Sequence, residues 1–255
     1  PVDARAHVRG DTDTPLSELT IAQLLARAAQ RFPDRPAVVF REHGVRWSWA
    51  EFQRKVDDLA AGLLALDVAP GDRVGIWSPN RVEWLVTQFA TARIGAILVN
   101  INPAYRLAEL EYALNKVEVS VLVTAARFKT SDYLEMLRTL APELDRCAPG
   151  ALQAARLPHL RAVIRMGEQR SPGMLAYGDV ASASGGVARA RLDEIGATLG
   201  CRDAINIQFT SGTTGAPKGA TLTHRNVVNN ARFIARAMRF TEQDRLCIPV
   251  PLYHC

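Results

Sequence analysis

A short stretch near the end of the chain, residues 210–219, has the composition of a loop that binds phosphate. Its ten residues include four hydroxyl side chains, three glycines and one lysine. Glycine lets the main chain turn sharply beside a polyphosphate, hydroxyl and amide groups donate hydrogen bonds to its oxygens, and lysine adds positive charge. Lys218 is conspicuous because only four of the 31 basic residues are lysines. The stretch predicts a site for a phosphorylated ligand.

This loop differs from the common nucleotide-binding P-loop. That pattern, G-x-x-x-x-G-K-[ST], continues from the lysine through serine or threonine into a helix, whereas here Pro217 precedes Lys218 and Gly219 follows it. No G-x-G-x-x-G pattern supports a dinucleotide fold either. On composition alone, a surface loop without a ligand remains the alternative.

Composition and charge narrow the class of protein. Hydrophobic residues make up 48% and charged residues 22%, as in soluble folded proteins. No apolar stretch reaches the roughly 18 residues of a membrane-spanning helix, and residues 1–14 lack the apolar core of a signal peptide. Within the net charge of +5, residues 187–255 hold nine Lys and Arg against five Asp and Glu. Because no basic run is interleaved with aromatics, a small phosphorylated ligand is favoured over nucleic acid; a solvated basic helix face is the alternative.

The four cysteines predict neither a disulfide scaffold nor zinc chemistry, because they are few, widely spaced and form no C-x-x-C pair. A reducing cytoplasm or organelle matrix fits this pattern, and we expect a cytoplasmic protein. His254 lies near Cys247 and Cys255, but three donors without a fourth do not make a metal site. No metal-binding residues are predicted.

The elements that must position the loop alternate between short apolar strands and longer amphipathic helices. This alternation predicts βαβ units, and hence an α/β fold with a parallel sheet flanked by helices. Residues 147–157 and 167–186 are rich in Pro, Gly, Ser and Ala and predict loops, with 181–186 flexible. Thr223 is expected to cap the last helix. The predicted helices are 21–31, 48–66, 82–94, 108–116, 131–141 and 224–239, and the predicted strands are 37–40, 74–77, 97–100, 119–124, 162–165, 204–209, 220–222 and 246–250.

The loop and its strand resemble a known family. Residues 209–219, F-T-S-G-T-T-G-A-P-K-G, match the signature phosphate loop of the AMP-forming adenylate synthetases almost residue for residue. The one departure is Phe209, where many members carry tyrosine. This family includes acyl-CoA synthetases, luciferases and the adenylation domains of peptide synthetases.

Further matches extend over nearly the whole chain beyond its first twenty residues. Three look like core motifs of the family: W-S-W-A-E-F at 47–52, R-I-G-A at 93–96 with Asn102-Pro103, and P-L-Y-H at 251–254. Four resemble the medium-chain fatty acyl-CoA synthetase branch: F-K-T at 128–130, P-G-A-L at 149–152, I-N-I-Q at 205–208 and V-N-N at 228–230.

The resemblance implies an activity. An enzyme of this kind joins a fatty acid to ATP, forming acyl-AMP and pyrophosphate, and then transfers the acyl group to coenzyme A. ATP, Mg²⁺ and coenzyme A are the implied cofactors, and a medium-chain fatty acid is the implied substrate. A homodimer is left open, and neither nucleic acid nor a membrane span is expected.

The resemblance also implies site residues. The phosphates of ATP are expected at Thr210, Ser211, Gly212, Thr213, Thr214, Gly215, Ala216, Pro217 and Lys218. His254 is expected near the acyl carboxylate and the α-phosphate, as a catalytic group that orients the attacking oxygen. A structural histidine at the end of a strand is the alternative for His254.

The family's later motifs, which hold adenine, ribose and magnesium, have no counterpart in this sequence, and neither does its C-terminal domain. We therefore expect an N-terminal extension at 1–20, a partial AMP-binding domain at 21–255, and a fragment that is inactive alone. An aryl-CoA ligase, a luciferase-like monooxygenase or another adenylating enzyme is the alternative within the family. A non-catalytic nucleotide-binding module is the alternative outside enzymes.

Overall fold

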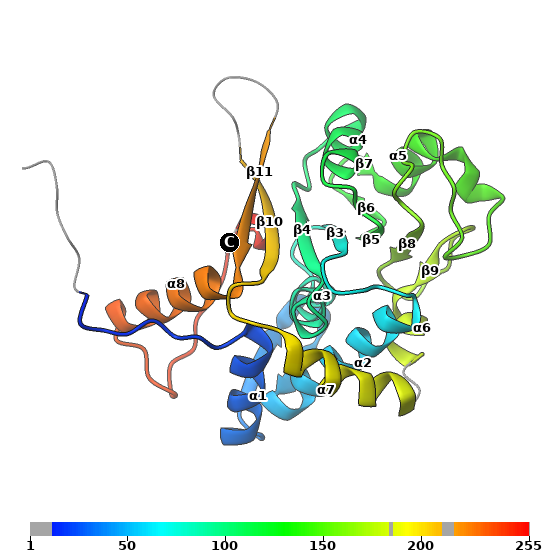
Figure 1. Cartoon of the computed structure of the whole chain (residues 1–255). Helices are drawn as coiled ribbons and strands as arrows, with labels where there is room; N and C mark the ends of the chain where they lie inside the picture. The colour runs from blue at the N-terminus through cyan, green and yellow to red at the C-terminus, as the bar shows by residue number, and fades with distance from the viewer. Residues whose placement is uncertain (1–11, 184–185, 211–216, 255) are drawn as a thin grey trace, which may run out of the picture.

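A computed structural model describes residues 12–183, 186–210 and 217–254, without the side chains of 186–189. Its centre is a seven-stranded sheet in the order β11-β10-β4-β3-β5-β8-β9 (Figure 1). The strands are β3 (Arg73–Trp77), β4 (Ile97–Ile101), β5 (Val121–Thr124), β8 (Ala162–Arg165), β9 (Leu175–Ala176), β10 (Ala204–Thr210) and β11 (Lys218–Thr223). All neighbours in the sheet are parallel except β10 and β11. The predicted α/β fold with a mostly parallel sheet is confirmed.

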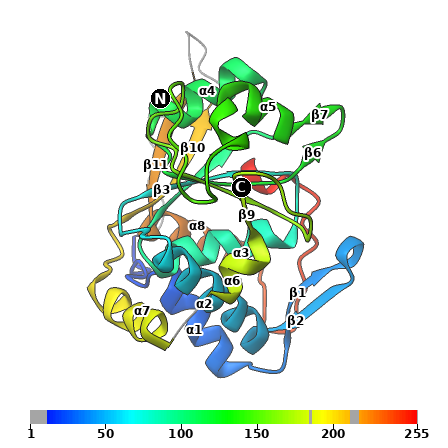
Figure 2. The ribbon, with the colours of Figure 1, turned by 90° about the vertical axis from the view of Figure 1, so that its right-hand side faces the viewer.

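Helices cover both faces of the sheet, as Figures 1 and 2 show from two directions. One face carries α1 (Ile21–Arg31), α2 (Trp49–Ala65), α3 (Val82–Arg93), α6 (Tyr177–Ser182) and α7 (Gly186–Thr198). The other carries α4 (Leu107–Lys116) and α5 (Tyr133–Leu140). Because both faces are covered, most residues of the inner strands are apolar, and every residue of β5 and β8 is buried.

Most predicted elements agree with the structure to within one or two residues. Helix α1 begins at a capping box in which Thr20 and Gln23 bond each other's main chain, and α2 begins at an equivalent box formed by Ser48 and Glu51. Helix α8 (His224–Ala237) begins at the predicted cap, Thr223, whose side chain accepts a hydrogen bond from the Asn226 N–H. These caps fix the helix starts that the sequence indicated.

The predicted strand at 246–250 is wrong. This segment forms no strand, because no strand of the described chain pairs with its main chain. Its alternating apolar residues Leu246, Ile248 and Val250 are 61%, 52% and 47% exposed. An apolar alternation becomes a strand only where a partner satisfies its main-chain groups.

The predicted loop at 167–186 is also partly wrong. It contains β9 and α6, and α6 packs so closely on α2 that a Cβ on Gly62 would lie 1.9 Å from the Val180 carbonyl oxygen. The close packing of α6 on Gly62 leaves no periodic pattern in the sequence. The sequence therefore did not predict this helix. The sequence also missed α7 and three short strands. These are β2 (Val45–Ser48), which pairs with β1 (Pro36–Phe40), and the hairpin of β6 (Arg127–Phe128) with β7 (Ser131–Asp132).

Three short 3-10 helices complete the description: η1 (Arg41–His43), η2 (Pro142–Asp145) and η3 (Leu252–His254). Among the described residues, no helix has the length and apolar character to cross a membrane.

Candidate phosphate-binding site

The β10–β11 hairpin carries the predicted phosphate loop. Strand β10 is held by β4 on one side and by β11 on the other, and Thr210 lies directly opposite Lys218 where the two strands of the hairpin end. The Thr210 hydroxyl lies 3.4 Å from the Lys218 carbonyl oxygen, to which it donates. The two strands form one edge of the sheet, to the left of β4 in Figure 1. Ser211, Gly212, Thr213, Thr214, Gly215 and Ala216 lie outside the described residues.

Both ends of the loop are anchored to the rest of the molecule. Phe209 is partly buried and packs against the main core, and the Tyr112 hydroxyl on α4 donates a hydrogen bond to the Pro217 carbonyl oxygen at 3.2 Å. The side chains of Thr210 and Lys218 are exposed. A threonine and a lysine thus lie opposite each other at the start and end of the loop, and their hydroxyl and ammonium groups are donors that suit phosphate oxygens.

The carboxyl edge of the sheet is where an open α/β fold places its ligands. Strands β3, β4, β5 and β10 are parallel, so the loops that follow them meet at this edge. The phosphate loop follows β10, and Asn80 follows β3. The structure brings η3, which ends at His254, to the same strands, where it contacts β4.

His254 is exposed, and its ring lies 5.8 Å from that of Tyr253 in a tilted arrangement. The main chain that leads to His254 is held by two asparagines. Asn80 bonds the main chain of Val250 and Leu252, and Asn100 on β4 donates to the Tyr253 carbonyl oxygen. Burial is the main reason that the pKa of the nearby Tyr105 is raised, and the neighbouring Glu109 and Tyr253 add to it. Tyr105 therefore stays protonated at neutral pH.

Sequence reasoning missed three residues around the candidate site: Asn80, Asn100 and Tyr112. Asn100 had a signal, since it is a polar residue inside the apolar strand Ile97–Ile101. Tyr112 had none, because a tyrosine on an amphipathic helix is ordinary. Within the described residues, no three His, Cys, Asp or Glu side chains gather as they would around a metal ion.

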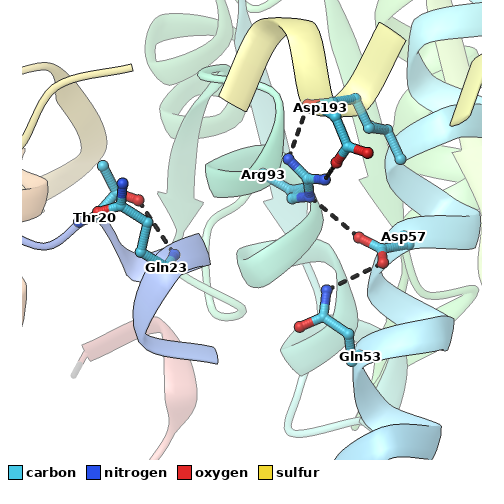
Figure 3. Close-up of polar contacts among 7 residues, drawn as sticks. Thr20, Gln23, Gln53, Asp57, Arg93 and Asp193 are labelled. Atoms are coloured by element: carbon cyan, nitrogen blue, oxygen red, sulfur yellow. Dashed lines mark hydrogen bonds and ion pairs between the residues drawn. The ribbon is translucent and has the colours of Figure 1, made fainter. Parts of the chain in front are cut away.

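Two of the sequence motifs have structural roles. In the motif at 47–52, Ser48 and Glu51 form the capping box of α2. In the second, Arg93 joins three helices: it bonds Asp57 on α2 at 3.2 Å and, on α7, Asp193 at 2.6 Å and the Leu192 carbonyl oxygen at 2.8 Å. Figure 3 shows the guanidinium between the two carboxylates, with Gln53 bonded to Asp57.

A family model described as AMP-binding enzyme matches residues 25–255. The curated relatives include the medium-chain acyl-CoA ligase ACSF2, mitochondrial, of Danio rerio, with 44% identity over 257 residues. The protein of the same name from Homo sapiens is 43% identical over 262 residues. Each alignment covers all of this chain and 42% of the relative, so the chain spans less than half of these proteins.

Solved structures share the fold. Acetoacetyl-CoA synthetase from Streptomyces lividans matches with a TM-score of 0.75 and 26% identity, over 92% of this chain and 35% of that one. The inhibitor-bound N-terminal domain of FACL13 from Mycobacterium tuberculosis matches with a TM-score of 0.74 and 25% identity, over 92% of this chain and 52% of that one.

The expected cytoplasmic location is corrected by this comparison. The animal relatives at 42–44% identity are named as mitochondrial proteins. A low cysteine content fits a reducing compartment, but it does not distinguish one reducing compartment from another.

Proposed function

Because this chain belongs to the AMP-binding enzyme family, we propose that it is the ATP-phosphate-binding part of a longer acyl-CoA ligase that activates medium-chain fatty acids. The observation that carries the proposal is the β10–β11 hairpin, which places Thr210 directly opposite Lys218 at the carboxyl end of β10. The names of the relatives support the acyl substrate. In this proposal residues 1–20 are an N-terminal extension and 21–255 are part of an AMP-binding domain.

The proposed reaction has two steps. A fatty acid carboxylate attacks the α-phosphorus of ATP, so that a carboxyl oxygen–phosphorus bond forms and pyrophosphate leaves. The sulfur of coenzyme A then attacks the acyl carbon, and AMP leaves. Since the first step brings two anions together, the protein has to align them and offset the charge that develops on pyrophosphate.

The loop offsets the negative charge that develops on pyrophosphate. Thr210 and Lys218 bind the β- and γ-phosphates from the two ends of the loop, and the ammonium charge of Lys218 is offset by no neighbouring carboxylate among the ion pairs of the described chain. The hydrogen-bond donors of the loop fit the phosphates of MgATP. The loop contains no carboxylate that would bind Mg²⁺ itself. Mg²⁺, when bound, supplies further positive charge on those oxygens. The proposed phosphate-binding residues are Thr210, Ser211, Gly212, Thr213, Thr214, Gly215, Ala216, Pro217 and Lys218.

In this proposal, His254 helps to align the carboxylate with the α-phosphate. It follows a segment fixed to the carboxyl ends of β3 and β4 by Asn80 and Asn100. An imidazole there can donate a hydrogen bond to the attacking carboxylate and orient it toward the α-phosphate.

The test is carboxylate-dependent exchange of labelled pyrophosphate into ATP, measured on the gene product read to its natural stop with short, medium, long and aromatic acids. Exchange driven by a medium-chain acid supports the proposal. Exchange driven only by aromatic acids replaces it with an aryl-CoA ligase, and ATP binding without exchange for any acid replaces it with a binding module. We expect the 255-residue chain alone to be inactive, since its relatives are more than twice as long.

A further inference from the structure

The segment that leads into His254 is held by a side chain in the manner of a neighbouring strand. Asn80 Nδ2 donates to the Val250 carbonyl oxygen at 2.8 Å, and Asn80 Oδ1 accepts from the Leu252 N–H at 2.7 Å. The single side-chain amide of Asn80 therefore hydrogen-bonds the main chain on both sides of Pro251. Pro251 has no N–H with which to pair in a sheet. The Asn80 side chain instead satisfies the main-chain groups on either side of it.

A second asparagine holds the same segment from beneath. Asn100 is only 2% exposed, and its Nδ2 donates to the Tyr253 carbonyl oxygen at 3.4 Å. Its Oδ1 accepts from Asn206 Nδ2 at 3.3 Å, and Asn206 is 5% exposed on β10. A continuous chain of amides thus runs from the strand that carries the phosphate loop to the residue before His254.

These amides are costly to bury. An amide buried in a core without hydrogen bonds destabilises the fold relative to an apolar side chain. The rest of β4 is Ile97, Leu98, Val99 and Ile101, any of which would suit position 100 if only packing mattered. The amide at this position is explained by the partners it holds.

We propose that Asn80 and Asn100 are positioning residues that fix the place of His254 relative to the phosphate loop. Neither touches a reacting atom in this proposal. Asn80 sets the direction of the main chain at 250–252, and Asn100 ties residue 253 to β10 through Asn206. The proposal rests on the adenylation function above, because it needs His254 to act on the bound acid.

The test compares three substitutions of one kind in the full-length enzyme: Asn80→Leu, Asn100→Leu and Asn229→Leu. Leucine is close to asparagine in size and removes donor and acceptor without adding charge beside the phosphates. Asn229 is the matched control. It is 6% exposed and bonds Ser17 and Arg225 between α8 and the N-terminal segment, away from His254.

We expect Asn80→Leu and Asn100→Leu to lower the kcat of pyrophosphate exchange about tenfold, the size of one or two hydrogen bonds. The KM for ATP should stay within about twofold, because the loop still binds the phosphates. Asn229→Leu should lower the melting temperature while leaving both constants within about twofold. In a His254→Ala background, Asn80→Leu and Asn100→Leu should cause no further loss, since they act through the missing imidazole.

Any other result contradicts the proposal, and the results distinguish failure of the positioning role from failure of the adenylation function. Unchanged kcat in the Asn80 and Asn100 variants, beside a clear loss in His254→Ala, overturns the positioning role alone. The same conclusion follows if the losses persist in the His254→Ala background, or if Asn229→Leu loses as much kcat. Full exchange in His254→Ala removes the group to be positioned, and no exchange in the unsubstituted enzyme overturns the adenylation function itself.

Discussion

The phenol of Tyr112 reaches from α4 to the main chain of the phosphate loop, donating to the Pro217 carbonyl oxygen at 3.2 Å. Pro217 immediately precedes Lys218, so this bond fixes the main chain from which the lysine extends. Helix α4 lies on one face of the sheet, whereas Lys218 begins the outermost strand. The position of the charge therefore depends on a helix from a distant part of the sequence.

Tyr112→Phe should raise the KM for ATP about two- to tenfold and change kcat little. The substitution removes one hydrogen bond, worth about 0.5–1.5 kcal/mol, that holds the loop in both the ground state and the transition state. Initial rates of pyrophosphate exchange at varied ATP measure it. Tyr177→Phe is the control, because that hydroxyl also donates to a main-chain oxygen, of Glu83, but lies on α6. An equal rise in KM in both variants would count against a specific role for Tyr112.

Lys218→Ala should reduce kcat/KM for exchange by roughly ten- to a hundredfold, the effect of losing a charge-assisted hydrogen bond of about 1.5–3 kcal/mol. Lys129→Ala is the control, since its ammonium group lies over the exposed end of the β6–β7 hairpin, 5.3 Å from the Phe128 ring. Activity retained in Lys218→Ala would remove this lysine from the phosphate site.

Acid should destabilise the protein through His224. This side chain is fully buried, and its Nδ1 accepts the Ile21 N–H at 3.1 Å, which requires the neutral ring. Burial lowers the pKa of His224 from 6.5 to about 4, against a smaller opposing effect of Asp203. As the pH falls from about 6.5 to 4, the unfolded chain binds a proton that the folded chain excludes, so the free energy of unfolding should fall by about 1–3 kcal/mol.

Urea denaturation of the full-length protein at several pH values measures this decrease. His224→Asn is the matched variant, because an amide oxygen can accept the Ile21 N–H without titrating. The difference in stability between the two proteins should shrink as the pH falls. A constant difference across this range would show that His224 does not cause the acid sensitivity.

Arg93→Ala should lower the free energy of unfolding by about 1–3 kcal/mol, because it leaves Asp57 on α2 and the Leu192 carbonyl oxygen on α7 without their hydrogen-bond donor (Figure 3). The arginine side chain is 15% exposed and the Asp57 side chain 26%. Asp193 is 86% exposed, so Asp193→Ala should cost no more than about 1 kcal/mol. Chemical denaturation of both variants checks the ranking, which would be wrong if the two losses were equal.

The fold was largely predictable because its signals are local and repeated. The apolar strands Arg73–Trp77, Val121–Thr124 and Ala162–Arg165 stand between amphipathic helices, and caps such as Thr223 mark where helices begin. The expected strand at 246–250 failed for the opposite reason. Its pattern is local, but a strand also requires a partner, which the pattern cannot supply.

The candidate site was predictable only at its loop. Lys218 and Thr210 lie within ten residues of each other and could be recognised from composition and order. The contacts of Asn80, Asn100 and Tyr112 cross 105 to 172 positions of the chain, and no spacing rule connects residues so far apart. Their roles follow from the sheet order, in which β10 lies beside β4 and not beside β8 or β9.

That sheet order also affects how the protein is assembled during synthesis. Strands β3, β4, β5 and β8 can pair as soon as they leave the ribosome, whereas β10 must return to β4 across 106 residues, the separation of Asn206 and Asn100. Pairing across such a distance pays a large loop-closure entropy and is slow. The edge of β4 therefore stays unpaired while more than a hundred further residues are translated, and an unpaired strand edge is prone to pair with other chains.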